Sequence, residues 1–250
     1  MNEQSIKNKK AWEYRAYEFW NKRDGAPLNK ANKILNNLGE CLKKHKEYFN
    51  NIEDKKIANL CGSNGRKAVP LALLGAKVTV FDISEENKKY ALELAHCANT
   101  SIDYIVEDVY DIDLNIYGNY FDILYLEGGI LHYFNDIDRL MNLLYSLLKH
   151  EGRMILSDFH PLKKYFDNDG KINGEVNYFD KTLRKGDLAY KQFFSEEEQS
   201  AFPDVSIRLY TISEIINSIV KAGFTLKKFE EHPGWNNENI PWEFTILADK

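Results

Sequence analysis

The chain has 250 residues, a formal charge of −5 and 44% hydrophobic residues, which is the composition of a folded globular protein. No apolar run approaches the roughly 20 residues that a membrane span needs, and the polar start lacks the apolar core of a signal peptide. We therefore expect a cytoplasmic protein without a membrane partner. The acidic charge argues against a broad nucleic-acid-binding face. Three widely spaced cysteines predict neither a disulfide framework nor a metal site.

The N-terminal segment reads as helical. Apolar and aromatic side chains recur at helical spacing across residues 8–50, with a break at residues 25–27. We expect residues 1–51 to form a helical lid and residues 52–250 to form the main domain. An irregular, aromatic-rich insertion is expected at about 161–209. Its rings, and those of Trp12 and Trp20, can either wall an organic ligand or pack on a sheet.

From residue 55 onward, strand patterns alternate with helical ones. Strands are predicted at 56–61, 77–82, 102–106, 121–126 and 153–157, with helices after most of them, including one that carries leucines from 140 to 148. Thr211 and Glu214 form a capping box that opens a last helix, which Gly223 ends. Two final strands, around 226–229 and 242–248, are close enough in sequence to pair antiparallel. Repeated strand–helix units predict an α/β, doubly wound, Rossmann-like sheet, which binds ligands at the carboxyl ends of its strands.

Small and acidic residues stand where these strands end. The turn after the first strand holds Asn59, Cys61, Gly62, Ser63 and Gly65, whose small size lets backbone approach a ligand. An acid such as Asp82, at the end of the second strand, can accept from both hydroxyls of a ribose.

The third strand runs into Asp108, and an acid there can accept from an adenine amino group. Taken singly, Asp82 can be a neighbour of the helix cap Ser84 and Asp108 a solvated loop acid. Their occurrence at successive strand ends favours a nucleoside ligand.

Four runs of sequence, IANLCGSNGRKAVPLALLGAKVTVFDIS, VEDVYDI, FDILYLEGGILHYF and GRMILSDFHP, resemble class I S-adenosylmethionine-dependent methyltransferases. The similarity is closest to the small-molecule, ubiquinone-biosynthesis-like type and covers roughly residues 52–160 and 207–250. It implies a seven-stranded sheet with its last strand antiparallel, and S-adenosylmethionine as the cofactor. By position it implies these cofactor-binding residues: Asn59, Cys61, Gly62, Ser63, Gly65, Asp82, Ile83, Glu107, Asp108, Val109, Leu126 and Glu127. In the lid, we expect Tyr14 to be the ring that reaches the cofactor.

The turn departs from the family pattern in two ways. The family often has an acid where Asn59 stands, and glycines where Cys61 and Ser63 stand. The same two positions break the Gly-x-Gly-x-x-Gly fingerprint of nicotinamide dehydrogenases, which are the nearest competitors on this architecture.

Methyl transfer is an in-line displacement in which the protein orients the acceptor and, where needed, removes its proton. Candidates for that proton are His132, Asp158 and His160, which follow the fourth and fifth strands. We favour His132 and His160 as catalytic residues because histidine ordinarily titrates near neutrality. Either can instead be a packing or loop residue. Cys61 is rejected as a nucleophile because nothing basic adjoins it.

These patterns predict an S-adenosylmethionine-dependent methyltransferase that acts on a small organic molecule at O, N or C. Two alternatives stay open: a nucleic-acid or protein methyltransferase, and a cofactor-binding protein without turnover. The acceptor and the oligomeric state do not follow from the sequence.

Overall fold

The computed structural model describes residues 1–166, 171, 177–234 and 239–250. Contacts between residues divide the chain into two compact units, each made of two stretches. Unit 1 comprises Met1–Ile112 and Lys185–Val205, and unit 2 comprises Asp113–Arg184 and Ser206–Lys250. The helical segment 1–51 thus falls in the same unit as the strands that directly follow it.

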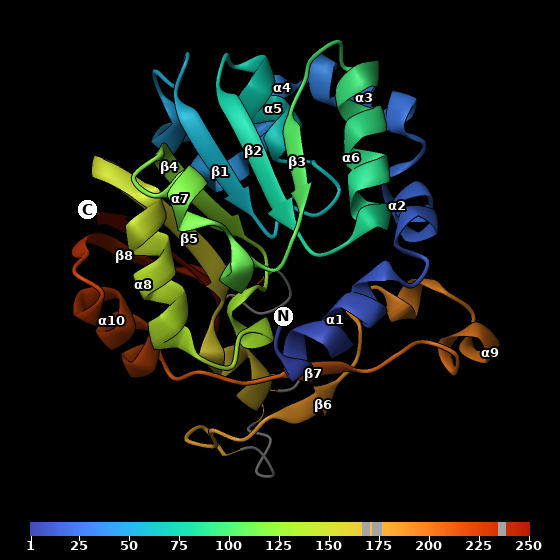
Figure 1. Ribbon diagram of the computed structural model, residues 1–250. Helices are drawn as coiled ribbons and strands as arrows, with labels where there is room; N and C mark the ends of the chain where they lie inside the picture. The colour runs from blue at the N-terminus through green and yellow to red at the C-terminus, as the bar shows by residue number, and fades with distance from the viewer. Residues whose placement is uncertain (167–170, 172–176, 235–238) are drawn as a thin grey trace. The chain divides into compact units, whose positions relative to one another are not determined.

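A seven-stranded sheet has the order β3-β2-β1-β4-β5-β9-β8, which confirms the predicted Rossmann-like class (Figure 1). In unit 1, β1 (Lys56–Leu60), β2 (Lys77–Asp82) and β3 (Asp103–Val106) pair in parallel. In unit 2, β4 (Phe121–Glu127) pairs in parallel with β5 (Leu148–Phe159). The last strand, β9 (Pro241–Asp249), runs antiparallel to both β5 and β8 (Thr225–Pro233), as expected.

Helices of unit 1 precede and alternate with its strands. They are α1 (Glu3–Glu13), α2 (Ala16–Asp24), α3 (Pro27–Asn36), α4 (Leu38–Cys41), α5 (Ala68–Leu73) and α6 (Glu85–Cys97), with 3-10 turns η1 (Lys43–Phe49) and η2 (Val109–Asp111). Helices α2 and α3 lie against α6, where Phe19, Trp20 and Ile34 are buried (Figure 1). The predicted helical region 8–50 is therefore real but divided into short pieces, because Arg15 at φ 56° and Gly25 at φ 88° interrupt it.

Unit 2 contains α7 (Leu114–Tyr117), α8 (Ile137–Leu147) and α10 (Ile212–Lys221), with 3-10 turns η3 (Leu131–Tyr133) and η4 (Pro161–Tyr165). The predicted capping box of Thr211 and Glu214 opens α10. Leu148 was expected in the helix but begins β5, where it pairs with Phe121 of β4. That placement buries Leu148 fully against a strand far away in sequence.

The insertion forms several short elements in the part that the structure describes: β6 (Arg184–Gly186), η5 (Lys191–Phe193), α9 (Glu196–Gln199) and β7 (Val205–Ile207). The chain passes between the two units within β6 and again within β7. Within the described ranges, each helix is too short or too polar to cross a membrane.

Candidate active site

The turn after β1 adopts a left-handed backbone at several successive positions. Cys61 and Ser63 each have φ 51°, and Gly65 has φ 76°. Left-handed backbone suits glycine and strains residues with a Cβ. A Cβ at Gly65 would also lie 2.9 Å from the Cβ of Ala91. The turn thus has a left-handed shape of the kind that glycine favours, although Cys61 and Ser63 occupy two of its positions.

Asp82, at the end of β2, organises this turn. Its buried carboxylate accepts from the backbone N–H of Ser63 (3.0 Å) and of Ser84 (3.0 Å), and from the Asn87 side chain (3.0 Å). Burial raises the pKa of Asp82, and these three donors oppose that rise. Ser84 caps α6 as predicted, since its hydroxyl accepts from the Asn87 N–H. Asp82 therefore both faces the turn and supports the start of α6.

The end of β3 lies next to the end of β2, because the Glu107 N–H donates to the Asp82 carbonyl (2.9 Å). One oxygen of Asp108, Oδ1, accepts from the Tyr110 N–H (3.0 Å). The other oxygen, Oδ2, is buried and has no hydrogen-bond partner among the described residues, and the same holds for the hydroxyl of Ser63. Buried polar atoms of this kind normally find a partner, so the pair fits a ligand that carries hydrogen-bond donors.

The N-terminal helices are bonded to this region of unit 1. The Glu13 carboxylate accepts from the Glu85 N–H (2.9 Å) at the start of α6, and the Trp20 indole donates to Asn87 (2.7 Å). Tyr14 follows α1 directly; its ring meets Phe202 edge-on, with 4.9 Å between centroids. These contacts place Tyr14 in the same unit as the strand ends β1 to β3.

In unit 2, Leu126 and Glu127 end β4, Leu126 fully buried and Glu127 partly so. The next turn is tight, because a Cβ on Gly129, at φ 79°, would lie 2.5 Å from the Phe159 ring. After it, the Asp158 carboxylate accepts from the Ile130 N–H (2.9 Å) and the Leu131 N–H (2.7 Å).

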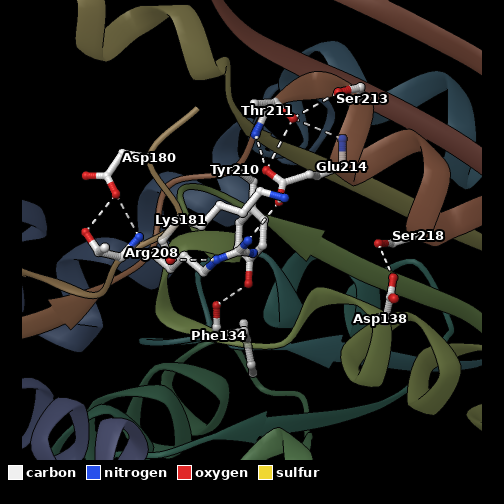
Figure 2. Close-up of polar contacts among 11 residues, drawn as sticks. Phe134, Asp138, Asp180, Lys181, Arg208, Tyr210, Thr211, Ser213, Glu214 and Ser218 are labelled. Atoms are coloured by element: carbon white, nitrogen blue, oxygen red, sulfur yellow. Dashed lines mark hydrogen bonds and ion pairs between the residues drawn. The ribbon is translucent and has the colours of Figure 1, made fainter. Parts of the chain in front are cut away.

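Residues 208–210 also contact the loop that follows β4. The Arg208 N–H donates to the His132 carbonyl (2.8 Å), and the Tyr210 hydroxyl donates to the Phe134 carbonyl (2.6 Å). Figure 2 shows how Arg208 in turn pairs with Glu214 (2.8 Å) of the capping box and lies over the Tyr210 ring. The backbone that carries His132 is therefore fixed from two directions.

The His132 ring itself makes no hydrogen bond within the described parts of the chain, and it lines a pocket of unit 2. Burial first, then the positive charges of Lys164 and Lys163, lower the pKa of His132 to about 3. This differs from the near-neutral titration expected from the residue type alone. His132 is thus a neutral imidazole at physiological pH.

His160 has a different environment. Its Nδ1 accepts from the Leu162 N–H (3.2 Å), and its Nε2 lies 3.0 Å from Glu231 Oε1. Burial lowers the pKa of this histidine, and Glu231 opposes that effect. Nε2 makes no hydrogen bond to a described residue, so the bond at Nδ1 alone ties the ring to the start of η4.

The cofactor-binding residues expected from the sequence fall into two sets. Unit 1 brings together Tyr14, Asn59, Cys61, Gly62, Ser63, Gly65, Asp82, Ile83, Glu107, Asp108 and Val109, whereas Leu126, Glu127, His132 and His160 belong to unit 2. The sequence reasoning missed Glu13, Asn64, Asn87 and Tyr104, which bond to the turn or to its neighbours, and Arg208 and Tyr210 near His132. Of these, only Asn87 carried a local signal, as the third residue after the helix cap Ser84.

Comparison with known proteins agrees with this architecture. Residues 60–156 match the methyltransferase domain family. A Listeria monocytogenes protein assigned as an S-adenosylmethionine-dependent methyltransferase is 21% identical, with a TM-score of 0.66 over 84% of this chain and 97% of that one. An S-adenosylmethionine-dependent methyltransferase from Mesorhizobium loti is 18% identical, with a TM-score of 0.61 over 82% and 97%.

Magnesium protoporphyrin IX methyltransferase from Synechocystis PCC 6803, solved with bound SAH, is 14% identical, with a TM-score of 0.62 over 99% of this chain and 100% of that one. None of the curated proteins matches the sequence. The family match and the sheet order agree with each other and with the strand-end residues. Residues 60–156 therefore match the methyltransferase domain family, and the chain has the fold of the S-adenosylmethionine-dependent methyltransferases to which it is similar.

Proposed function

We propose that this methyltransferase transfers a methyl group from S-adenosylmethionine to O, N or C of a small organic molecule. The observation that carries the proposal is the set of strand ends in unit 1, where buried oxygens of Asp108 and Ser63 have no partner among the described residues. In that set Asp82 would hold the ribose, Asp108 the adenine amino group, and the turn from Asn59 to Gly65 would lie against the ligand. Leu126 and Glu127, expected at its methionine end, belong to unit 2.

When bound, S-adenosylmethionine supplies a methyl group on a sulfonium, from which it is displaced in line. The protein's share of the chemistry is to orient the acceptor, exclude water and take a proton where the acceptor atom carries one. We assign that proton to the His132 ring. It is neutral, it carries no hydrogen bond to another described residue, and its backbone is fixed by Asp158 and Arg208.

Asp158 and His160 serve a different purpose in this proposal. The carboxylate of Asp158 is occupied by three backbone N–H groups, those of Ile130, Leu131 and Phe159. His160 accepts from the Leu162 N–H at Nδ1, and its Nε2 lies 3.0 Å from Glu231 without forming a hydrogen bond. We infer that both position the loops around His132.

A small acceptor is supported by two observations. The chain is acidic, which disfavours nucleic acid, and the similar Synechocystis enzyme acts on magnesium protoporphyrin IX, a small molecule. Turnover would distinguish an enzyme from a binding protein. Incubation with methyl-labelled cofactor and a metabolite extract, followed by mass spectrometry, should show labelled small molecules that accumulate with time.

The cofactor assignment is tested by titration calorimetry with SAH. Asp108→Asn keeps the Oδ1 acceptor that caps Tyr110 but replaces the second oxygen with a donor. It should weaken SAH binding by about 1.5–3 kcal/mol, the usual value of a hydrogen bond to a charged group. Asp103→Asn, at the exposed start of β3, is the matched control and should bind as the wild type does. Equal affinity in all three proteins would remove Asp108 from the site.

A further inference from the structure

The pocket that His132 lines lies wholly in unit 2, at the ends of β4 and β5. The space in it that is open to a water-sized molecule is about 40 Å³, and its walls include Leu131, Phe159, Tyr165 and Ile215. A space of this size holds a few water molecules, or one group as small as a carboxylate. The chemistry of that group can be read from the polar side chains that face it.

Most polar side chains of the lining are already engaged. Asp158 accepts from three backbone N–H groups, and His160 lies against Leu162 and Glu231. The hydroxyls of Tyr165 and Tyr210 donate to backbone carbonyls (3.1 and 2.6 Å). The polar lining groups that keep free hydrogen-bonding capacity, among the described residues, are the His132 ring, the Lys164 ammonium and Nε2 of His160.

Lys164 is exposed at this pocket, and Lys163 lies beside it, partly buried. The Lys163 ammonium is 3.4 Å from the centre of the Phe159 ring and 4.5 Å from that of Trp242. In the described part of the chain, no carboxylate forms an ion pair with either lysine. Burial, then Lys164, lower the pKa of Lys163 to about 8, while Glu243 and Asp158 oppose that effect. Both lysines act on His132, whose pKa they lower.

The acids near the pocket do not cancel this charge locally. Asp158 is covered by its three N–H donors, and Glu231 lies against His160. Glu243 of β9 raises the pKa of Lys163 by its negative charge. It forms no ion pair with Lys163 among the described side chains. Two adjacent cations without a paired acid, next to a neutral imidazole, are complementary to an anion with a proton-bearing group.

We propose that this pocket binds the methyl acceptor through an anionic group, most simply a carboxylate, which Lys164 holds, with Lys163 adding positive charge, while His132 faces the acceptor atom. The inference rests on the proposed function and names the class of substrate: a small organic acid that carries a hydroxyl, amine or second carboxylate to be methylated.

The test uses the full-length protein with labelled histidine imidazoles and follows the His132 resonance, assigned with His132→Gln. Acetate and benzoate are the probes, acetamide and benzamide are their uncharged counterparts, and chloride keeps the ionic strength constant. A carboxylate should shift the His132 signal saturably and raise its pKa, because it offsets two neighbouring positive charges. The amides should not.

Lys164→Gln should weaken the carboxylate response about two- to fivefold, as expected for one partly exposed ion pair. Lys227→Gln, an exposed lysine of β8, is the control and should respond as the wild type does. The inference is overturned if neither carboxylate gives a saturable shift, if the amides give the same shift, or if Lys164→Gln responds normally. SAH calorimetry on the same samples separates this outcome from failure of the proposed function, which would appear as absent SAH binding.

Discussion

The side-chain amide of Asn64 donates a buried hydrogen bond of 3.0 Å to the carboxylate of Asp24, the last residue of α2. Asn64 lies between Ser63 and Gly65, so this bond ties the turn after β1 to the end of α2. The other carboxylate oxygen of Asp24 lies 3.5 Å from the Lys30 ammonium and 3.4 Å from Nε of Arg23. The end of α2 thus supports the turn after β1 through Asp24.

Asp24→Ala should therefore weaken SAH binding without touching the ligand. The variant leaves the buried Asn64 amide without its acceptor, which costs about 1–3 kcal/mol, and frees a strained turn to move. Calorimetry and urea unfolding measure the two effects. In a double-mutant cycle, Asn64→Ala and Asp24→Ala should be far from additive. Asp54→Ala, which removes an exposed ion pair with Lys77, is the control; the prediction fails if it lowers SAH affinity as much.

The left-handed residues of the turn give a second prediction. Cys61→Gly and Ser63→Gly should each raise the free energy of unfolding by up to about 1 kcal/mol, because relief of left-handed strain exceeds the added freedom of the unfolded chain. Cys61→Ala keeps the Cβ and should show no such gain. Thermal unfolding of the three variants decides the matter. A loss of stability in both glycine variants would mean that the side chains contribute packing greater than the strain.

Local patterns predicted much of this fold. The strands of unit 1 appear within a residue or two of their expected limits, and the caps at Ser84 and Thr211 form as expected, because each depends on neighbours within one helical turn. Leu148 was misplaced because its partner Phe121 is 27 residues earlier in a parallel pairing. Likewise, the acceptors of Asn64 and of the Arg208 N–H are far away in sequence, so no local spacing could indicate them.

Tyr190 joins the insertion to α1 and gives a third prediction. Its buried hydroxyl donates to the carbonyl of Tyr14 (2.7 Å), and its ring stacks on Phe19, with 4.5 Å between centroids. Tyr190→Phe should lower the free energy of unfolding by about 1 kcal/mol through the lost hydrogen bond. Tyr145→Phe, a partly buried tyrosine whose hydroxyl makes no hydrogen bond to another described residue, should be nearly neutral. Equal stability of the two variants would exclude this role for the Tyr190 hydroxyl.

Asp158 should make stability depend on pH in an unusual direction. Burial outweighs its three N–H donors and raises its pKa to about 6, from 3.8. The folded protein therefore binds this proton more tightly than the unfolded chain, and stability falls as pH rises from about 4 to 6. The difference in unfolding free energy between wild type and Asp158→Asn should fall by about 3 kcal/mol across that range and stay constant above it. A constant difference throughout would show that the carboxyl titrates normally.

His132 makes the opposite contribution to stability and carries the last prediction. Its folded pKa of about 3 lies below the value of 6.5 for an exposed histidine, so its contribution is complete above pH 6.5 and is lost as pH falls toward 3. His132→Gln should remove that part of the acid sensitivity. It should also lower kcat by about 10²–10⁴, the usual value of a general base, with SAH affinity unchanged.

The pH dependence of the rate separates this role from packing. Because the imidazole stays neutral from pH 5 to 8 in the free enzyme, His132 should contribute no acidic limb near 6.5 to the profile of kcat/KM. A substrate carboxylate beside Lys164 would raise the pKa of His132 in the enzyme–substrate complex. The profile of kcat should therefore show an acidic limb that His132→Gln lacks. His96→Gln, in the last turn of α6, controls for loss of a histidine elsewhere. If His132→Gln reduces stability alone and leaves kcat within a few-fold, the ring is a packing residue, and orientation of the acceptor supplies the rate.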